Sequence, residues 1–154
     1  TTQMTTQYVL AHLITDPNSL SRVRAEFKPS ESAVDIKAAL KKDLTLEKCS
    51  GLTYLGYVLQ EALRLNPIIP VGSPVHFQQD TRLGRLRVRA HEIIMINILG
   101  LHLNNEQWQR PYEFLPDRFD IAHPLSRTPA GERRSTFAWL PFNGGKRICF
   151  GKTF

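Results

Sequence analysis

The sequence predicts a mainly α-helical fold with a small β-sheet, and three observations lead to this α+β class. Residues 5–65 show helical spacing of their apolar side chains. Residues 68–99 hold prolines, glycines, and apolar residues that alternate with arginines, a pattern typical of short strands. Residues 108–154 are rich in prolines, glycines and aromatic residues, without a sustained period. We therefore expect helices first, a small sheet next, and a loop-rich end.

The helical part begins with a predicted helix over residues 5–15. Its apolar stripe consists of Val9, Leu10, Leu13 and Ile14. Asp16 is a suitable N-cap for a second helix, and Pro17 suits the first position of that helix. A third helix is predicted over residues 30–42.

The strongest helical pattern covers residues 53–65 and ends before Pro67. Its apolar positions recur at i, i+3, i+4, i+7 and i+8: Leu55, Val58, Leu59, Ala62 and Leu63. The preceding residues 49–51, Cys-Ser-Gly, are predicted to form a loop.

The middle of the chain is predicted to form the sheet. Residues 68–76 are extended, residues 86–88 alternate in polarity, and residues 93–99 form a short apolar run. A helix is expected over residues 103–108. Residues 120–136 then form a long loop, and loops of such length usually have a function or wrap a surface.

The composition is that of a globular protein, with 42% hydrophobic and 22% charged residues. The net charge is +6, and the only dense basic run holds Arg82, Arg85, Arg87 and Arg89. We interpret this run as a solvated strand edge. A docking face for an acidic protein is the second interpretation, and a nucleic-acid groove is the third.

The two cysteines, Cys49 and Cys149, lie in unlike contexts, so we expect free thiols rather than a disulfide scaffold. No run approaches the roughly 18 apolar residues of a membrane span. The sequence begins without methionine and ends three residues after Gly151. We therefore expect these 154 residues to be a fragment of a longer protein.

The residues around Cys149 form an unusual pattern. Residues 142–151, the cysteine loop, read FNGGKRICFG. The glycines let the backbone approach a flat ligand closely, and Arg147 offers a planar charged fork for a carboxylate. Residues 150–154 can open a helix whose amides would stabilise a sulfur anion. The loop therefore favours Cys149 as a thiolate ligand.

Other roles for Cys149 fit less well. A small buried hydrophobe in a glycine turn is the plainest alternative. Zinc needs about four ligands at close spacing, and no second cysteine or histidine lies near Cys149. A cysteine nucleophile would need a histidine base, and the nearest, His123, has nothing to recommend it. A flat cofactor with one protein thiolate, such as haem, fits best.

Two further stretches hold charged residues in defined patterns. Glu61 and Arg64, in EALR, share a helix face opposite the apolar stripe, so periodicity predicts a solvated pair. Residues 108–119 alternate prolines and aromatic residues with charges, as a packed loop does. Arg118 from this segment is a candidate partner for Glu61.

EALR, residues 108–119 and the cysteine loop, in this order along the chain, resemble motifs of the cytochrome P-450 superfamily, the haem-thiolate monooxygenases. EALR resembles the ExxR motif of helix K. FLPDRF is similar to FxPERF, with Asp117 in place of glutamate, and FNGGKRICFG matches FxxGxRxCxG. The resemblance implies one partial domain over residues 1–154, from the end of helix I through the haem-binding loop. Within it, helices cover residues 5–65, the small sheet 68–99, and the meander and haem loop 108–154.

The resemblance also implies site roles. Cys149 would be the axial ligand of the iron of haem b (iron protoporphyrin IX), and Arg147 would bind a propionate. Phe142 would shield the sulfur, while Gly145 and Gly151 would shape the loop. The implied structural triad behind the haem is Glu61, Arg64 and Arg118, which conflicts with the periodicity and would bury this pair.

The chain departs from the family pattern in places. Thr5 and Thr6 resemble the end of the oxygen-activating segment of helix I, but Met4 stands where an acid is expected. They are weak candidates for catalytic residues. His76 lies where a second propionate-binding arginine is frequent and is at best a substitute.

The implied function of the parent protein is monooxygenation: one atom of dioxygen enters a small apolar substrate. Electrons would come from NADPH through a flavoprotein reductase that docks near Lys146 and Lys152, without a role for nucleic acid. The resemblance suggests the cytosolic face of the endoplasmic reticulum membrane, reached through a missing N-terminal anchor. The alternative is a truncated or degenerate, non-catalytic remnant, and we expect the fragment alone to be inactive.

Overall fold

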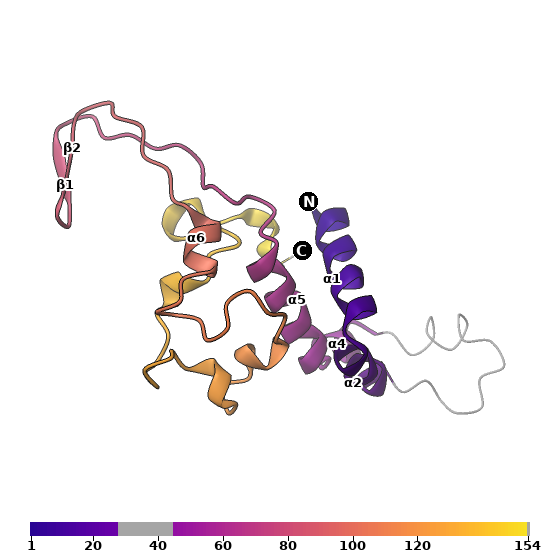
Figure 1. Ribbon diagram of the computed structural model, residues 1–154. Coiled ribbons are helices and arrows are strands. Elements are labelled where there is room, and N and C mark those ends of the chain that lie inside the picture. The colour runs from indigo at the N-terminus through magenta and orange to yellow at the C-terminus, as the bar shows by residue number, and fades with distance from the viewer. Residues whose placement is uncertain (28–44, 154) are drawn as a thin grey trace.

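The computed structural model describes residues 1–27 and 45–153. Figure 1 shows helices gathered on one side of the molecule and a thin arm, residues 71–97, projecting from the other. The helices on the first side are α1 (Thr2–Thr15), α2 (Pro17–Phe27), α4 (Leu46–Ser50) and α5 (Thr53–Leu65). The third helix predicted from the sequence, over residues 30–42, lies outside the described residues.

Helix α1 has a narrower apolar stripe than the sequence predicts. Val9 and Leu13 are buried, whereas Leu10 and Ile14 are 53% and 76% exposed. Helix α1 contacts the core along a narrow strip of its surface. Val9 and Leu13, four residues apart, lie on this strip, whereas Leu10 and Ile14 lie beside it. Asp16 caps α2 as predicted, and its carboxylate accepts hydrogen bonds from two backbone N–H groups of the first turn.

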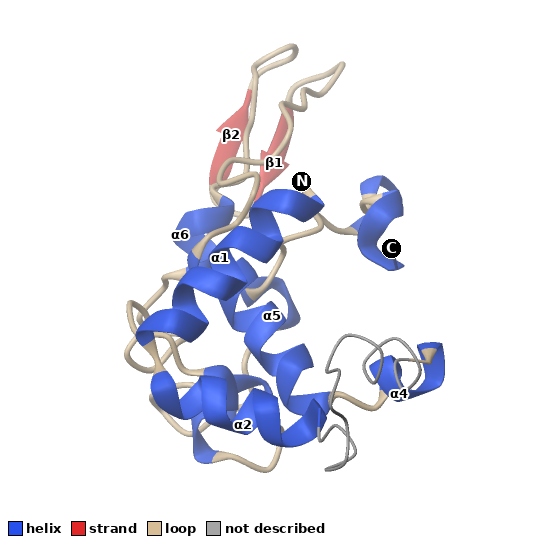
Figure 2. Cartoon of the chain, turned by 90° about the vertical axis from the view of Figure 1, so that its right-hand side faces the viewer, coloured by secondary structure: helices blue, strands red, loops and turns tan. Residues whose placement is uncertain are grey.

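Helix α5 is the centre of the fold, and its bounds agree with the predicted helix. Figure 2 shows α1 and α2 lying together over α5. The main hydrophobic core lies between these helices: Val9, Leu13, Val23, Tyr54, Val58 and Ala62. Leu59, predicted on the stripe, lies at its edge and is 39% exposed.

Cys49 lies in a short helix, α4, and the predicted loop over residues 49–51 is therefore wrong. Thr45 caps this helix, since its hydroxyl oxygen accepts a hydrogen bond from the Lys48 N–H at 3.2 Å. Gly51 ends it. The cap at Thr45 thus stabilises a short helix here, and Gly51 only marks its end.

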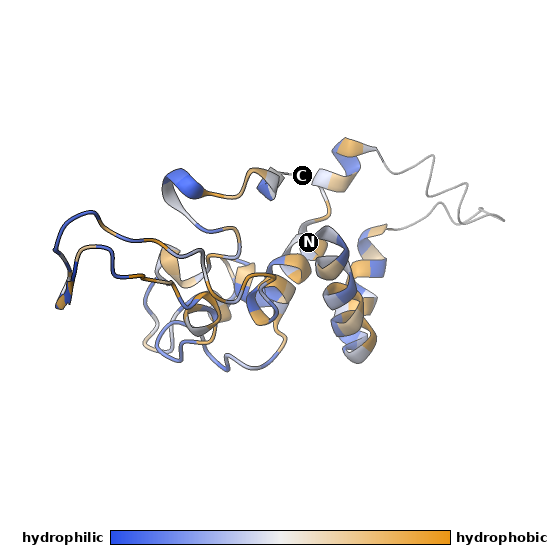
Figure 3. Ribbon diagram, turned by 90° about the horizontal axis from the view of Figure 1, so that it is seen from above, coloured by the Kyte–Doolittle hydropathy of each residue, from blue (hydrophilic) through white to orange (hydrophobic). Residues whose placement is uncertain are grey.

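The predicted small sheet is a single antiparallel hairpin at the tip of the arm. Strand β1 (Thr81–Leu83) pairs with β2 (Leu86–Val88). Gly84 in the turn has a φ of +58°, which glycine adopts without strain. Two isolated antiparallel bridges join the sides of the arm: Val71–Asn97 and Val75–Ile94. In Figure 3 apolar and hydrophilic segments alternate along this arm.

Of the strand predicted over residues 93–99, only two isolated bridges form, at Ile94 and Asn97, and the helix predicted over residues 103–108 is wrong. Helix α6 (Ile98–His102) begins earlier because the Asn97 side chain accepts a hydrogen bond from the Gly100 N–H at 2.8 Å. It ends earlier because the chain turns at Asn104, whose side chain accepts from the Glu106 N–H.

The C-terminal part is irregular, as predicted, and contains short 3₁₀ helices: η1 (Pro116–Phe119), η2 (Pro124–Ser126), η3 (Thr136–Ala138), η4 (Gly145–Arg147) and η5 (Phe150–Thr153). The long loop predicted over residues 120–136 holds η2, one isolated bridge and, at its last residue, the start of η3. Within residues 1–27 and 45–153, no helix combines the length and apolar character that a membrane crossing requires.

Candidate functional site

Glu61 and Arg64 lie one turn apart on α5, and both side chains are fully buried. Arg64 donates two parallel hydrogen bonds to the carboxylate, from Nε to Oε2 at 2.7 Å and from Nη2 to Oε1 at 2.8 Å. The solvated pair predicted from periodicity is therefore wrong. The physical reason is that η1 and the segment before it cover this side of α5.

Arg118 reaches the same carboxylate from η1. Its Nε donates to Glu61 Oε1 at 2.9 Å, and the Leu115 N–H donates to the same oxygen at 2.9 Å. One carboxylate therefore accepts from two guanidinium groups and one amide. Together Glu61, Arg64 and Arg118 form the buried arginine cluster.

Backbone carbonyls accept the other hydrogen bonds of both arginines. Those bonded to Arg64 belong to His102, Pro111 and Glu113, and those bonded to Arg118 belong to Gln109, Arg110 and Glu113. Within the described part of the chain, no buried side-chain nitrogen or oxygen lacks a partner. Burial lowers the pKa of Arg118, although the attraction of Glu61 opposes that effect. A cluster so fully bonded ties α5 to the meander.

Sequence reasoning missed Arg134, which packs beside this cluster. Its guanidinium carbon lies 3.8 Å from the centre of the buried Trp108 ring, and that of Arg64 lies 5.0 Å from the same ring. Arg134 also donates to the carbonyl of Leu125 at 2.7 Å. Burial lowers its pKa to about 10, helped by repulsion from Arg118. Nothing in its local sequence, RRST, distinguishes it from a surface arginine.

His102 is a second residue that sequence reasoning missed. It is fully buried at the end of α6. Its Nδ1 lies 3.1 Å from the Arg64 carbonyl oxygen, and its Nε2 accepts from the Leu140 N–H at 2.9 Å. Burial lowers the pKa of His102 to about 4, so the ring is neutral near pH 7. Repulsion from Arg64 adds to this, while Glu61 opposes it.

The cysteine loop is closed by its own backbone. The Cys149 N–H donates to the Phe142 carbonyl at 2.9 Å, and the Ile148 N–H donates to the Gly145 carbonyl at 3.3 Å. Gly145 has a φ of +64°, which a residue with a side chain adopts only with strain. These bonds hold the two ends of the loop side by side.

Aromatic packing anchors the start of the loop. The Phe142 ring packs edge-on against Trp139, with centroids 6.3 Å apart. The Trp139 indole donates to the Gln60 carbonyl of α5 at 3.2 Å. The loop is therefore tied to α5, the helix that carries Glu61 and Arg64.

Cys149 itself is a free, exposed thiol, with Arg147 exposed two residues before it. A methyl group added at Gly151 would lie 3.8 Å from the sulfur, an ordinary contact. Residues 1–27 and 45–153 contain no group of three or more His, Cys, Asp or Glu that could hold a metal. The donor set is thus one soft thiol beside one guanidinium. It fits a flat cofactor that takes a single protein ligand and carries carboxylates.

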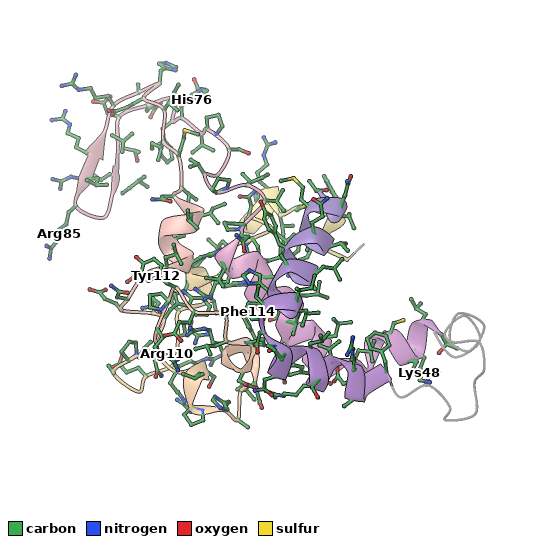
Figure 4. The ribbon with its side chains drawn as sticks, turned by 45° about the vertical axis from the view of Figure 1, so that its right-hand side comes forward. Lys48, His76, Arg85, Arg110, Tyr112 and Phe114 are labelled. Carbon is green, nitrogen blue, oxygen red and sulfur yellow. The ribbon has the colours of Figure 1, made fainter. Side chains whose placement is uncertain are left out.

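The weaker candidates lie elsewhere. The Thr5 and Thr6 hydroxyls donate to backbone carbonyls of their own helix, at 3.4 and 3.0 Å. His76 is exposed on the arm, where its ring lies 5.8 Å from that of His91 (Figure 4). The structure brings neither the threonines nor His76 into hydrogen-bond contact with Cys149 or Arg147.

Asp117 also has a partner from the helical side. Arg22 of α2 donates to both of its carboxylate oxygens, at 2.8 and 2.7 Å. This pairing lowers the pKa of Asp117. The ring of Phe114 stacks on that of His12, with centroids 4.3 Å apart, so the meander also lies against α1 (Figure 4).

Comparison with known proteins adds a family to this geometry. The family model described as Cytochrome P450 matches residues 1–154. A trifunctional (S)-stylopine/(S)-nandinine/(S)-canadine synthase of Argemone mexicana is 34% identical over 97% of the chain, and Cytochrome P450 CYP99A1 of Sorghum bicolor is 30% identical over 100% of it. The chain spans only 28% and 29% of these two relatives.

A solved structure agrees with this comparison. A zebra fish cytochrome P450 structure with abiraterone superposes with a TM-score of 0.73 at 28% identity. The match covers 97% of this chain and 32% of the zebra fish chain.

Proposed function

Because this chain belongs to the cytochrome P450 family, we propose that it forms the haem-thiolate part of a monooxygenase. The observation that carries the proposal is the free, exposed Cys149 thiol on a loop closed by the bond from its own N–H to Phe142. The activity of the whole protein belongs to the proposal, because the chain spans under a third of its relatives' length.

Individual residues of the cysteine loop have separate proposed roles in binding haem b. Cys149, as a thiolate, would hold the iron, and the Arg147 guanidinium would pair with a propionate carboxylate. Phe142, which packs against Trp139, would shield the sulfur once the cofactor is bound. When bound, haem iron supplies dioxygen activation, so that one oxygen atom enters the substrate.

The buried arginine cluster would support this loop indirectly, through α5, whose Gln60 carbonyl accepts from the Trp139 indole. It fixes the meander on α5 through two guanidinium groups bonded to one carboxylate. A rigid support matters because a ligand must be held close to its productive geometry. Glu61, Arg64 and Arg118 thus have a structural role, without touching the cofactor.

Electron supply and substrate follow from the same family. Lys146 and Lys152, both exposed, offer positive charge beside the thiol to an acidic flavoprotein reductase fed by NADPH. Three relatives carry (S)-canadine synthase in their names, which supports a small organic substrate, and we propose that it is apolar. The proposed location is the cytosolic face of the endoplasmic reticulum membrane, with an anchor outside this chain.

A non-catalytic remnant is the second candidate. Met4 stands where the family has an acid, and the Thr5 and Thr6 hydroxyls are bonded within their own helix. Single-turnover oxygenation by the full-length protein, supplied with electrons chemically, distinguishes the two. A Thr5→Ala, Thr6→Ala double variant that retains full product formation would remove these residues from catalysis.

The direct test of haem binding is a reduced, carbon-monoxide difference spectrum of the full-length protein. We expect a red-shifted, thiolate-type Soret band that Cys149→Ala abolishes. Cys49→Ala is the matched control, because Cys49 is also free and exposed. A thiolate band that survives in Cys149→Ala, or is lost in both variants, would contradict the assignment.

A further inference from the structure

His102 connects two parts of the molecule that are distant in sequence. One ring nitrogen contacts the Arg64 carbonyl on α5, and the other contacts the Leu140 amide, two residues before the cysteine loop. The carbonyl of His102 itself accepts from Arg64 Nη1 at 2.9 Å. Both its side chain and its backbone are therefore bonded to the helix or to the segment that enters the loop.

The hydrogen-bond partners fix the tautomer of His102. The Leu140 N–H can only donate, so Nε2 must accept and carries no proton. The Arg64 carbonyl can only accept, so Nδ1 must carry the proton. A protonated ring would turn an N–H toward the Leu140 N–H. The neutral ring is therefore the only form that satisfies both contacts.

Two backbone hydrogen bonds, joined through the peptide between residues 142 and 143, connect Leu140 to the backbone of Cys149. The Leu140 carbonyl accepts from the Asn143 N–H at 3.2 Å, which makes the turn that starts the cysteine loop. The Phe142 carbonyl then accepts from the Cys149 N–H at 2.9 Å. Leu140 also packs on this turn, since its Cδ2 would lie 3.6 Å from a Cβ placed on Gly144.

We propose that His102 is a positioning residue for Cys149: its neutral imidazole holds the Leu140 amide, and thereby the cysteine loop, at a fixed place on α5. The inference rests on the proposed function only in taking Cys149 as the haem ligand. The chemistry that requires it is general, because a part-buried amide that loses its acceptor costs free energy and lets the local backbone rearrange.

Two substitutions separate the two contacts of His102. Gln carries its terminal oxygen three bonds from Cβ, as His carries Nε2, so His102→Gln keeps an acceptor for the Leu140 N–H. Asn carries its amide nitrogen two bonds from Cβ, as His carries Nδ1, so His102→Asn keeps only the donor to Arg64. His102→Phe removes both.

The experiment measures amide hydrogen exchange in the full-length protein without haem, and the carbon-monoxide difference spectrum with haem. We expect His102→Asn and His102→Phe to speed exchange in residues 140–149 at least tenfold, with α5 unchanged, and to lose most of the thiolate-type band. His102→Gln keeps both properties near those of the unchanged protein. The α5 peptides serve as an internal measure of global unfolding.

Three results would overturn the proposal. In the first, His102→Asn keeps the slow exchange of residues 140–149. In the second, Gln and Asn variants lose loop protection equally. In the third, α5 loses protection together with the loop, which would make His102 a support of the whole fold. The exchange measurement needs no haem and therefore tests the role of His102 by itself. If the protein without substitutions showed no thiolate band, the proposed function would be contradicted, and the exchange data would still decide the role of His102.

Discussion

The buried arginine cluster and the arm both contain several charged residues, but the arginines are buried in the first and solvent-exposed in the second. Arg64 and Arg118 have fully buried side chains, bonded to one carboxylate and to several carbonyls. In the arm, Arg87 lies 3.6 Å from Asp80, with side chains 78% and 56% exposed. Arg85 points away from the hairpin tip (Figure 4). Charge and residue type alone therefore do not distinguish a structural arginine from a solvated one.

The largest expected effect comes from removing a buried partner. Arg64→Ala leaves the Glu61 carboxylate without its bidentate partner, and we expect a loss of about 3–5 kcal/mol in unfolding free energy. Arg64→Lys keeps the charge but loses the planar fork, so it should rescue only part. Urea unfolding of the full-length protein measures both.

Arg85→Ala is the matched arm variant, and we expect it to change stability by less than about 0.5 kcal/mol. Equal losses in Arg64→Ala and Arg85→Ala would erase the distinction between the two regions.

The next effect is a pH dependence from His102. Its folded pKa of about 4 lies below the usual 6.5, so the unfolded chain binds more protons between these values. The unfolding free energy should therefore fall as pH falls from about 6.5 to about 4, by about 3 kcal/mol in total. His102→Gln, which does not titrate, should remove this part of the pH profile. An unchanged profile in that variant would assign the acid sensitivity to other groups.

The smallest effect belongs to the Arg22–Asp117 pair, whose side chains are 43% and 26% exposed. A partly solvated pair contributes roughly 0.2–1 kcal/mol, so Arg22→Ala should cost no more than that. A double-mutant cycle with Asp117→Asn isolates the interaction. A coupling above about 2 kcal/mol would place this pair with the buried cluster rather than with the surface.

The sequence predicted α5 well because its apolar stripe extends over three turns and Pro67 follows it. Periodicity could not predict the burial of Glu61 and Arg64, because that depends on η1, which comes about fifty residues later. The family motif supplied what the local pattern could not. Leu10 shows the opposite case, an apolar residue predicted to be buried that is exposed. An apolar stripe predicts which face of a helix is buried, but not how wide a strip of that face the neighbouring elements cover.

The sequence also failed to predict the short helices. The α4 and α6 helices are set by single side-chain caps, Thr45 and Asn97, which outweigh the glycine and the apolar run nearby. His102 and Arg134 carry no motif at all. Their roles arise from contacts with carbonyls and amides far away in the chain, which only the folded structure reveals.

The most direct test of the central claim is X-ray absorption at the iron edge of the full-length protein loaded with haem. We expect one sulfur atom bonded to iron, retained in Cys49→Ser and replaced by a lighter atom in Cys149→Ser. A sulfur ligand that persists in Cys149→Ser, or iron bonded only to nitrogen and oxygen in the unchanged protein, would contradict this claim.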